Sequence, residues 1–94
     1  MQHKKHSNSL VLYRLRMGFS KKYVSALLKH KNTSVISKLE QGRALPTLPT
    51  ALKLAVIYRI PVDFLYEAMY SNTRNEIRSR ESRLQREPRQ LTLL

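Results

Sequence analysis

The sequence predicts an all-α protein, and three observations support this fold class. First, the chain of 94 residues has only two Gly, and its four Pro lie between apolar runs, which suits helices joined by short connections. Second, apolar residues recur at helical spacing in several segments. Third, Ser, Thr or Asn precedes most of these segments, and such residues cap helix N-termini. We expect five helices in one domain at residues 8–71, between a basic arm at 1–7 and an Arg-rich extension at 72–94.

The first two helices are expected at residues 7–17 and 21–29. Gly18 ends the first helix, and Ser20 is a good N-cap for the second. In the first helix the residues at helical spacing are Leu10, Arg14, Leu15 and Gly18. In the second helix the residues expected to face inward are Val24, Leu27 and Leu28.

The third helix is expected to begin after Asn32 or Thr33 as its cap and to stop at Gly42 in a left-handed conformation. Its apolar side is formed by Val35, Ile36 and Leu39. The residues that fall at i, i+3, i+4 and i+7 and form one polar stripe are Ser34, Ser37, Lys38 and Gln41.

A fourth helix is expected after Thr47 as its cap, with Pro49 tolerated in its first turn. The residues expected on its buried side are Leu52, Ala55 and Val56. Pro61 starts a fifth helix with the sequence IPVDFLYEAMY. Its expected inward residues are Val62, Leu65 and Met69.

The extension from residue 72 onwards holds six Arg and three Glu and few apolar residues. Apolar residues recur there every seven positions, which could mark a coiled-coil seam; they are Tyr70, Ile77, Leu84 and Leu91. However, the alternate seam positions are polar, and Pro88 precedes the last member of the series. We favour a solvated helical extension held by pairs such as Glu76–Arg80.

The charge balance points to a polyanionic partner. Lys and Arg number 18 against six Asp and Glu, which gives a net charge of +12. A field of this size favours nucleic acid or an anionic membrane surface. The longest apolar runs, such as AVIY, are far shorter than a membrane span, and the two Arg in VLYRLRMGF argue against a signal peptide. We therefore expect a soluble, cytoplasmic protein that binds nucleic acid rather than membrane.

The sequence offers no catalytic, metal or cofactor site. The chain has no Cys, so thiolate metal sites and disulfides are excluded. His3 and His6 lie in the basic arm and His30 in a turn, which is a poor set of metal ligands. Ser, His and Asp do not form a nucleophile–base pattern, and there is no Gly-rich phosphate loop.

The second and third helices together form a helix-turn-helix pattern. In such a pair the second helix enters the DNA major groove, and its N-terminal residues reach base edges. Small polar residues at its start allow a close approach, although the same residues are also simply good N-caps. Lys21 and Lys22 sit at the start of the preceding helix, where positive charge opposes the helix dipole and suits a DNA phosphate.

Five short segments resemble the Cro/repressor-type (XRE) helix-turn-helix family of bacterial and phage regulators, over residues 8–70. They are Gly18-Phe19-Ser20, Val24-Ser25, Ile36-Ser37-Lys38-Leu39-Glu40-Gln41-Gly42-Arg43, Pro46 and Ile60-Pro61-Val62-Asp63-Phe64-Leu65. The resemblance implies a five-helix lambda-repressor-like domain. The chain departs from the family in a turn one residue longer, in Lys29 where many relatives have Gly, and in Ser25 in place of Ala.

The resemblance also implies roles for individual residues. The implied base-contacting residues are Asn32, Thr33, Ser34, Ser37 and Lys38. The implied phosphate-contacting residues are Lys21, Lys22, Lys31, Gln41 and Arg43. Arg14 and Glu40 are implied to form a buried ion pair between the first and third helices, which agrees with the position of Glu40 beside the apolar side of its helix.

A homodimer is implied as well, because one recognition helix reads too few base pairs to define a unique site. Half-sites of such a dimer lie about 34 Å apart. The residues expected at its interface are Ile60, Val62, Phe64, Tyr66 and Tyr70.

Together these observations predict a sequence-specific transcriptional regulator, a repressor that binds a palindromic operator as a dimer and has no enzymatic activity. Two alternatives remain. One is the antitoxin of a toxin–antitoxin pair, whose Arg-rich extension masks a toxin protein. The other is sequence-independent nucleic-acid binding driven by charge.

Overall fold

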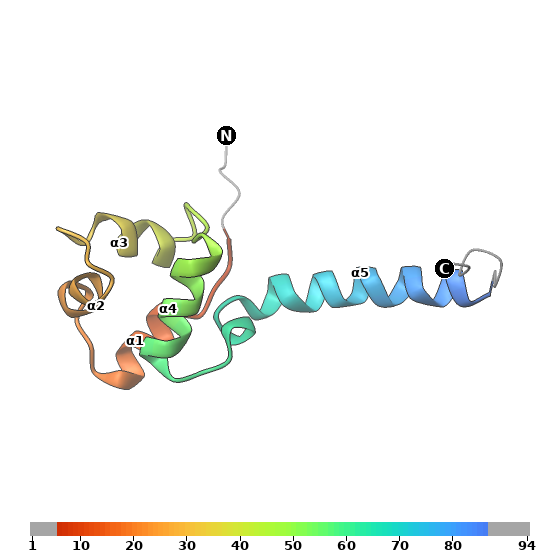
Figure 1. Cartoon of the computed structure of the whole chain (residues 1–94), viewed down its shortest axis with the longest axis horizontal. Coiled ribbons are helices and arrows are strands. Elements are labelled where there is room, and N and C mark those ends of the chain that lie inside the picture. The colour runs from red at the N-terminus through yellow and green to blue at the C-terminus, as the bar shows by residue number, and fades with distance from the viewer. Residues whose placement is uncertain (1–5, 87–94) are drawn as a thin grey trace.

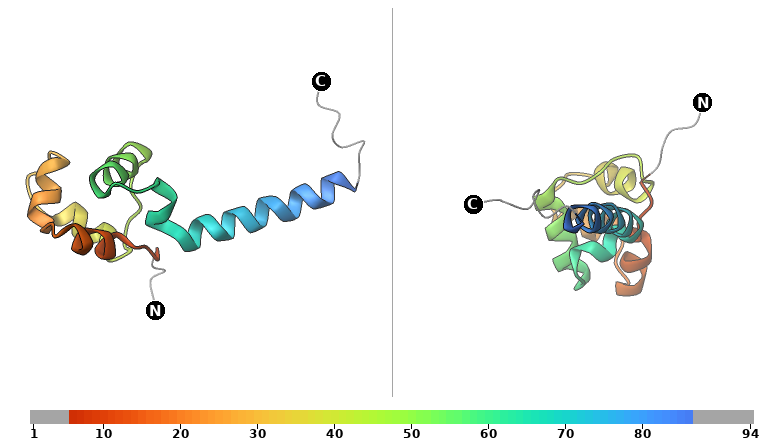
Figure 2. Two further views of the ribbon diagram at one scale, coloured as in Figure 1. Left: turned by 90° about the horizontal axis from the view of Figure 1, so that it is seen from below. Right: turned by 90° about the vertical axis from the view of Figure 1, so that its right-hand side faces the viewer.

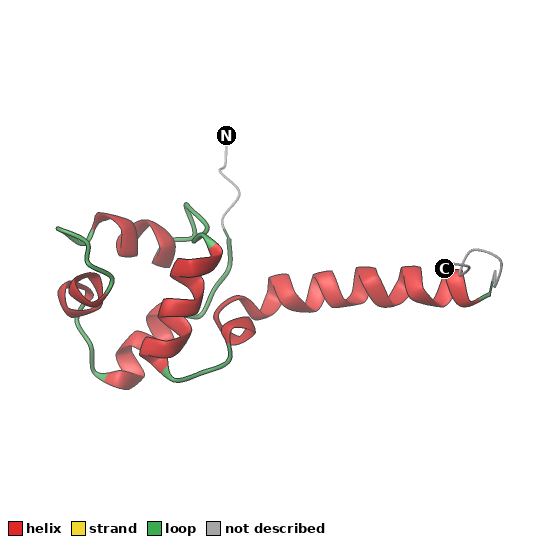
Figure 3. Cartoon of the chain, viewed as in Figure 1, coloured by secondary structure: helices red, strands yellow, loops and turns green. Residues whose placement is uncertain are grey.

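The computed structural model describes residues 6–86, and every regular element in this range is helical (Figure 3), which confirms the predicted fold class. The elements are α1 (Leu10–Met17), α2 (Lys21–Leu27), α3 (Ser34–Glu40), α4 (Leu48–Tyr58), the 3-10 helix η1 (Val62–Tyr66) and α5 (Glu67–Gln85). The predictions that concern His3, Pro88 and Leu91 lie outside the described residues.

The molecule has two parts of different shape. Helices α1–α4 and η1 form a compact body, and α5 leaves this body as a single straight helix (Figures 1 and 2). The radius of gyration is 17.5 Å and the principal extents are 54 × 36 × 22 Å. A compact domain of this length would have a radius of about 12 Å, so α5 accounts for the elongated shape.

The core of the body is one apolar cluster to which all four α-helices and η1 contribute. Its largest fully buried side chains are Leu10, Val24, Ile36, Leu39, Leu54 and Leu65. Burial of each such side chain stabilises the folded state by about 1.5–3 kcal/mol. The core therefore fixes the positions of α2 and α3 relative to α1 and α4.

The predicted caps are present at two helix starts. The hydroxyl of Ser20 accepts from the backbone N–H of Tyr23 at 3.0 Å, and that of Thr47 accepts from the backbone N–H of Thr50 at 3.4 Å. Gly18 and Gly42 follow α1 and α3 with φ of 72° and 75°, which is the left-handed region that glycine tolerates.

Of the three residues predicted on the buried side of α4, Ala55 is confirmed, and Leu52 and Val56 are wrong. Leu52 and Val56 are 47% and 76% exposed, whereas the buried residues are Ala51, Leu54, Ala55 and Tyr58. This segment is apolar on almost every side, so helical spacing permits two neighbouring faces. Contact with α1 and η1 selects the face that carries Leu54 and Tyr58.

Three further residues predicted to be buried are exposed, namely Leu27, Val35 and Met69. Leu15, placed at helical spacing with Leu10, is also exposed. In α2 the small side chain of Ser25 takes the inward position beside Val24. The buried face is therefore centred on Val24, Ser25 and Leu28, and Leu27 lies outside it.

The boundaries of the first and fifth helices also differ from the prediction. Helix α1 begins at Leu10 rather than Ser7, because the side-chain oxygen of Asn8 accepts from the backbone N–H of Leu10 at 3.0 Å. The fifth helix is divided at Tyr66, whose φ of −136° and ψ of 60° are not helical. Met69 consequently belongs to α5, while Leu65 belongs to η1.

Candidate nucleic-acid interface

Helices α2 and α3 pack against each other as the two helices of a helix-turn-helix. Ser25 of α2 is only 2% exposed, so its position accommodates a small side chain. Residues 28–33 connect the two helices, and Lys29 adopts a φ of 63° in this connection. A lysine in this region is strained relative to glycine.

The carboxylate of Glu40 joins α3 to α1. The Nε of Arg14 donates to Oε2 of Glu40 at 2.6 Å, and Nη2 of Arg14 donates to Oε1 at 3.2 Å. The third nitrogen, Nη1, donates to the backbone oxygen of Phe19 at 3.1 Å. The two side chains are 12% and 3% exposed, so this is the buried ion pair that the resemblance implied, and it fixes the orientation of α3.

The surroundings of this pair alter two pKa values. The hydrogen bond from Arg14 to Glu40 raises the pKa of the guanidinium above its usual range. Burial raises the pKa of the Tyr58 hydroxyl to about 12, with a further contribution from the charge of Glu40. Both groups therefore keep their ordinary charge at neutral pH: Arg14 is positive and Tyr58 is neutral.

The exposed face of α3 points away from the body, at the upper edge of the molecule in Figure 1. Ser34, Lys38 and Gln41 are exposed on it, and Ser37 is half-buried. Val35 is 43% exposed and lies at the border of this face, one turn before Lys38. The face therefore offers hydroxyls, one ammonium group, one amide and one branched apolar group, which are the groups that read base edges in the major groove.

The two residues before α3 differ in their roles. The side-chain oxygen of Asn32 accepts from the backbone N–H of Ser34 at 2.9 Å, so Asn32 caps the start of α3. Thr33 occupies the formal cap position but makes no capping hydrogen bond. The hydroxyl of Thr33 is therefore available to a ligand, whereas the oxygen of Asn32 is already used.

The side chain of Lys21 lies between α2 and α3, because its Nζ donates to Oγ of Ser37 at 3.3 Å. Lys22 and Lys31 are exposed, and so is Arg43, which donates to Oε1 of Gln41 at 3.4 Å. The structure thus brings most of the implied phosphate-contacting residues to the borders of the exposed face of α3.

Charge on this surface is of one sign. Residues 20–43 contain six cationic residues and a single acidic residue, Glu40. The cations are Lys21, Lys22, Lys29, Lys31, Lys38 and Arg43. Glu40 is buried against Arg14, so no carboxylate from this segment opposes a phosphate backbone.

Two features of the site were missed from the sequence. Val35 was assigned to the core, because helical spacing alone does not separate it from Ile36. Asn8 ties the start of the chain to the end of α3: its Nδ2 donates to the backbone oxygen of Leu39 at 3.0 Å and to that of His6 at 2.9 Å. The backbone N–H of His6 also donates to the oxygen of Gly42 at 2.8 Å. The only sequence signal for this tie is the run of capping residues Ser-Asn-Ser.

The residues expected at a dimer interface fall into two groups. Ile60, Val62 and Tyr66 pack against the core of their own chain. Phe64 and Tyr70 are 40% and 50% exposed. The apolar surface that remains open near η1 is therefore smaller than the sequence suggested, and it continues onto Met69 and Tyr70 of α5 and onto Leu48 of α4.

Residues 10–65 match the model of the helix-turn-helix family (HTH_3), which covers more than half of the chain. The chain therefore belongs to this family of Cro/repressor-type (XRE) regulators, whose domain binds DNA. No curated protein matches the chain significantly.

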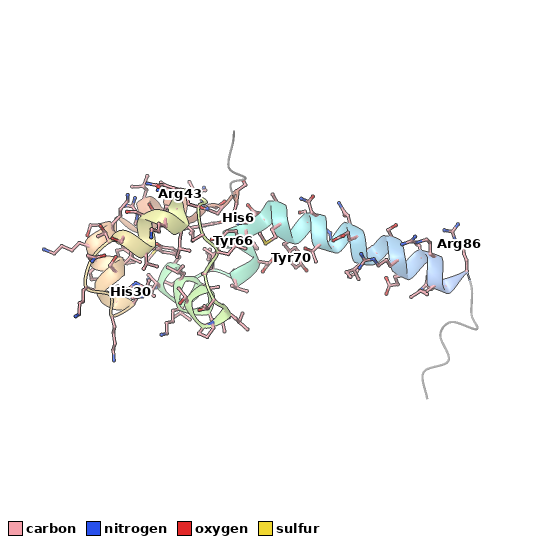
Figure 4. The ribbon with its side chains drawn as sticks, turned by 90° about the horizontal axis from the view of Figure 1, so that it is seen from above. His6, His30, Arg43, Tyr66, Tyr70 and Arg86 are labelled. Atoms are coloured by element: carbon pink, nitrogen blue, oxygen red, sulfur yellow. The ribbon has the colours of Figure 1, made fainter. Side chains whose placement is uncertain are left out.

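None of the helices within residues 6–86 is long and apolar enough to cross a membrane. Within the same range, no group of three or more His, Cys, Asp or Glu side chains is arranged to hold a metal ion. His30 stands apart from His6, at the other end of the body (Figure 4).

Proposed function

We propose that this protein is a sequence-specific transcriptional repressor that binds a palindromic operator as a two-fold dimer. The observation that carries the proposal is the exposed face of α3, where Ser34, Val35 and Lys38 are open to a ligand. Cationic side chains border this face, and the single carboxylate of the segment is turned inward. Occupancy of a promoter by such a dimer blocks transcription without any catalytic step.

The proposed recognition divides the residues into two groups. Thr33, Ser34, Ser37 and Lys38 contact base edges, and Val35 joins them as an apolar contact to a thymine methyl group. Lys22, Lys31 and Arg43 contact phosphates and set the register of the protein on the duplex. Lys21 has both roles. Its ammonium group donates a hydrogen bond to the base-contacting Ser37, and it also lies close enough to the duplex to contact a phosphate.

The experiment selects preferred sequences from random duplex DNA and then measures affinity against salt concentration. Lys22→Ala should weaken binding to all sequences alike and reduce the slope of log K against log salt by about one unit. Lys38→Ala and Val35→Ala should instead change which base is preferred at one position. Arg83→Ala, on α5, removes the same charge far from α3 along the chain and should leave the sequence preference unaltered.

The proposal has a clear opposing outcome. If the variants of α3 shift affinity for every sequence by the same factor, the protein binds nucleic acid through charge alone. A preferred sequence that depends on Lys38 or Val35 excludes that alternative.

A further inference from the structure

Helix α5 is the largest element of the molecule and has no buried residue along its 19 positions. Tyr70, Ile77 and Leu84 recur every seven residues and are 50%, 45% and 43% exposed. At this spacing the three side chains lie on one stripe of the helix. Figure 4 shows Tyr70 at the base of α5, beside the body, and Arg86 at its far end.

Contacts within the chain do little to hold this helix. Its two ion pairs, Arg78–Glu81 at 3.8 Å and Arg80–Glu76 at 3.6 Å, are exposed on both sides. Pairs of this type contribute a few tenths of a kcal/mol at most. Isolated helices of this length are marginal in water, and this one contains a single Ala, Ala68. A partner along the apolar stripe would supply the missing stabilisation.

We propose that this partner is α5 of a second copy of the chain, packed antiparallel about a two-fold axis near Ile77. This inference rests on the proposed dimeric function and names the segment that forms the dimer. Tyr70 and Leu84 are equally distant from Ile77 along the chain, so the stripe has the same order of positions when it is reversed. Tyr70 of each copy then lies close to Leu84 of the other, over a contact about 21 Å long.

The charged residues next to the stripe favour this direction. Arg74 and Glu81 lie on the same flank of it, one turn after Tyr70 and Ile77, respectively. In an antiparallel pair this flank faces its own reversed copy, so Arg74 of one chain approaches Glu81 of the other. In a parallel pair this flank instead faces the opposite flank of the other helix, which brings Glu81 close to Glu76 of the other copy, two like charges.

The two-fold symmetry of an operator also favours antiparallel packing of the two α5 helices. Helix α3 lies at the upper edge of the body in Figure 1, and α5 runs away from it across the view. A parallel pair has its two-fold axis along α5, and this axis would turn the second α3 to the opposite side. An antiparallel pair has its axis perpendicular to α5, and both α3 helices can then face the same duplex.

The apolar stripe also continues into the body. An open groove of about 610 Å³ lies at the base of α5. Its apolar lining includes Leu45, Leu48, Val62, Met69 and Tyr70. In the antiparallel pair the far end of the partner helix, with Leu84, arrives at this groove. The contact is therefore longer than the helix stripe alone.

Cysteine cross-linking tests the direction directly, because the natural chain has no Cys to interfere. The full-length variants are oxidised in the absence of DNA. Ile77→Cys should form a disulfide-linked dimer. A mixture of Tyr70→Cys and Leu84→Cys should give the mixed dimer in larger yield than either variant alone. A dimer formed mainly by Leu84→Cys with itself would overturn the antiparallel direction.

Sedimentation of the full chain tests the surface itself. Ile77→Asp should raise the dimer dissociation constant about 100-fold, because both copies lose a buried apolar side chain. The substitution lies on an exposed position of the isolated chain, so the circular dichroism of the body should be retained. Glu81→Arg should weaken the dimer, and Arg74→Glu combined with Glu81→Arg should restore it.

The outcomes separate this inference from the proposed DNA recognition. A monomeric natural chain at tens of micromolar, or an Ile77→Asp variant that dimerises as well as the natural chain, overturns the α5 contact. In that case α5 remains available for another protein, such as a toxin. Base preference at a single half-site is measured on Ile77→Asp itself, and its presence or absence decides the function of α3 independently.

Discussion

The body and α5 differ in the contacts that stabilise them. All of the buried hydrophobic residues within residues 6–86 lie between Leu10 and Leu65, and the one buried ion pair of that range joins α1 to α3. Helix α5 contains exposed ion pairs and an uncovered apolar stripe. Apolar side chains and ion pairs are therefore expected to contribute much to the stability of the body and little to that of α5 within a single chain. The difference indicates that the body folds through its own contacts, while α5 depends on what binds to it.

The largest expected difference between the body and α5 is the loss of stability when a glutamate is removed from an ion pair. Glu40→Ala leaves Arg14 buried without its partner and should lower the free energy of unfolding by about 3–5 kcal/mol. Glu76→Ala removes an exposed pair and should change it by less than about 0.5 kcal/mol. Urea unfolding followed by circular dichroism measures both. Similar midpoints for the two variants would mean that the body does not rely on its buried pair.

The two glycines of the body provide the next comparison. Both have positive φ, but a Cβ on Gly42 would lie 2.8 Å from the backbone oxygen of His6, whereas one on Gly18 meets nothing within 4 Å. Gly18→Ala should cost about 1–2 kcal/mol from backbone strain alone. Gly42→Ala should cost about 2–4 kcal/mol, because the segment at His6 must also move.

Thermal unfolding of these two variants gives the difference directly. A further variant, Asn8→Ala, loosens the same segment. Gly42→Ala should destabilise the protein more than Gly18→Ala does. This difference should be smaller when both substitutions are made in the Asn8→Ala variant. An equal cost at the two glycines would show that His6 does not pack against Gly42 in solution.

Alkaline pH should destabilise the body through Tyr58. Its pKa is about 12 in the folded chain and 10.0 in its ordinary environment, so the hydroxyl is neutral in both states below pH 10. Between pH 10 and 12 the unfolded chain loses this proton first, and stability falls by on the order of 2 kcal/mol. Tyr58→Phe should reduce this fall in a series of unfolding midpoints against pH. Tyr23→Phe, at an exposed position, should leave it unchanged.

The smallest expected effect is a gain of stability at Ser25. Its hydroxyl is buried and has no hydrogen-bond partner within the described structure. Ser25→Ala should therefore stabilise the body by about 1 kcal/mol. Ser79→Ala, on the exposed α5, makes the same chemical change without burial and reports the gain from helix propensity alone. If the two gains are equal, the hydroxyl of Ser25 is hydrogen-bonded in solution.

The sequence predicted the parts of the fold that depend on local chemistry. The all-helical class, the caps at Ser20 and Thr47 and the stops at Gly18 and Gly42 follow from residue types with narrow backbone preferences. The buried faces of α4 and α2 could not be predicted as well, because α4 is apolar on almost every side and α2 carries a polar residue, Ser25, on its buried face and an apolar one, Leu27, outside it. Only long-range packing decides whether Leu52 or Leu54 is inside.

The candidate site shows the same division. The polar stripe of α3 could be read from spacing, and the partner of Glu40 followed from a family resemblance. The exposure of Val35 could not be read from the spacing, because it depends on how α3 tilts against α1 and α4. The tie formed by Asn8 was also hidden, because a side chain that bonds to a backbone oxygen 31 residues away leaves no periodic signal.

This tie has a practical consequence for anyone who labels or fuses the protein. His6 is bonded to Gly42, and His6 and Arg43 lie on the same side of the body (Figure 4). A tag placed before His6 is therefore attached next to the end of α3, where a bulky fluorophore or carrier protein competes with a duplex for space. A group attached at Ser79 sits on α5, away from α3, and is exposed on the side opposite the stripe of Tyr70, Ile77 and Leu84, so it is the better handle for following DNA binding.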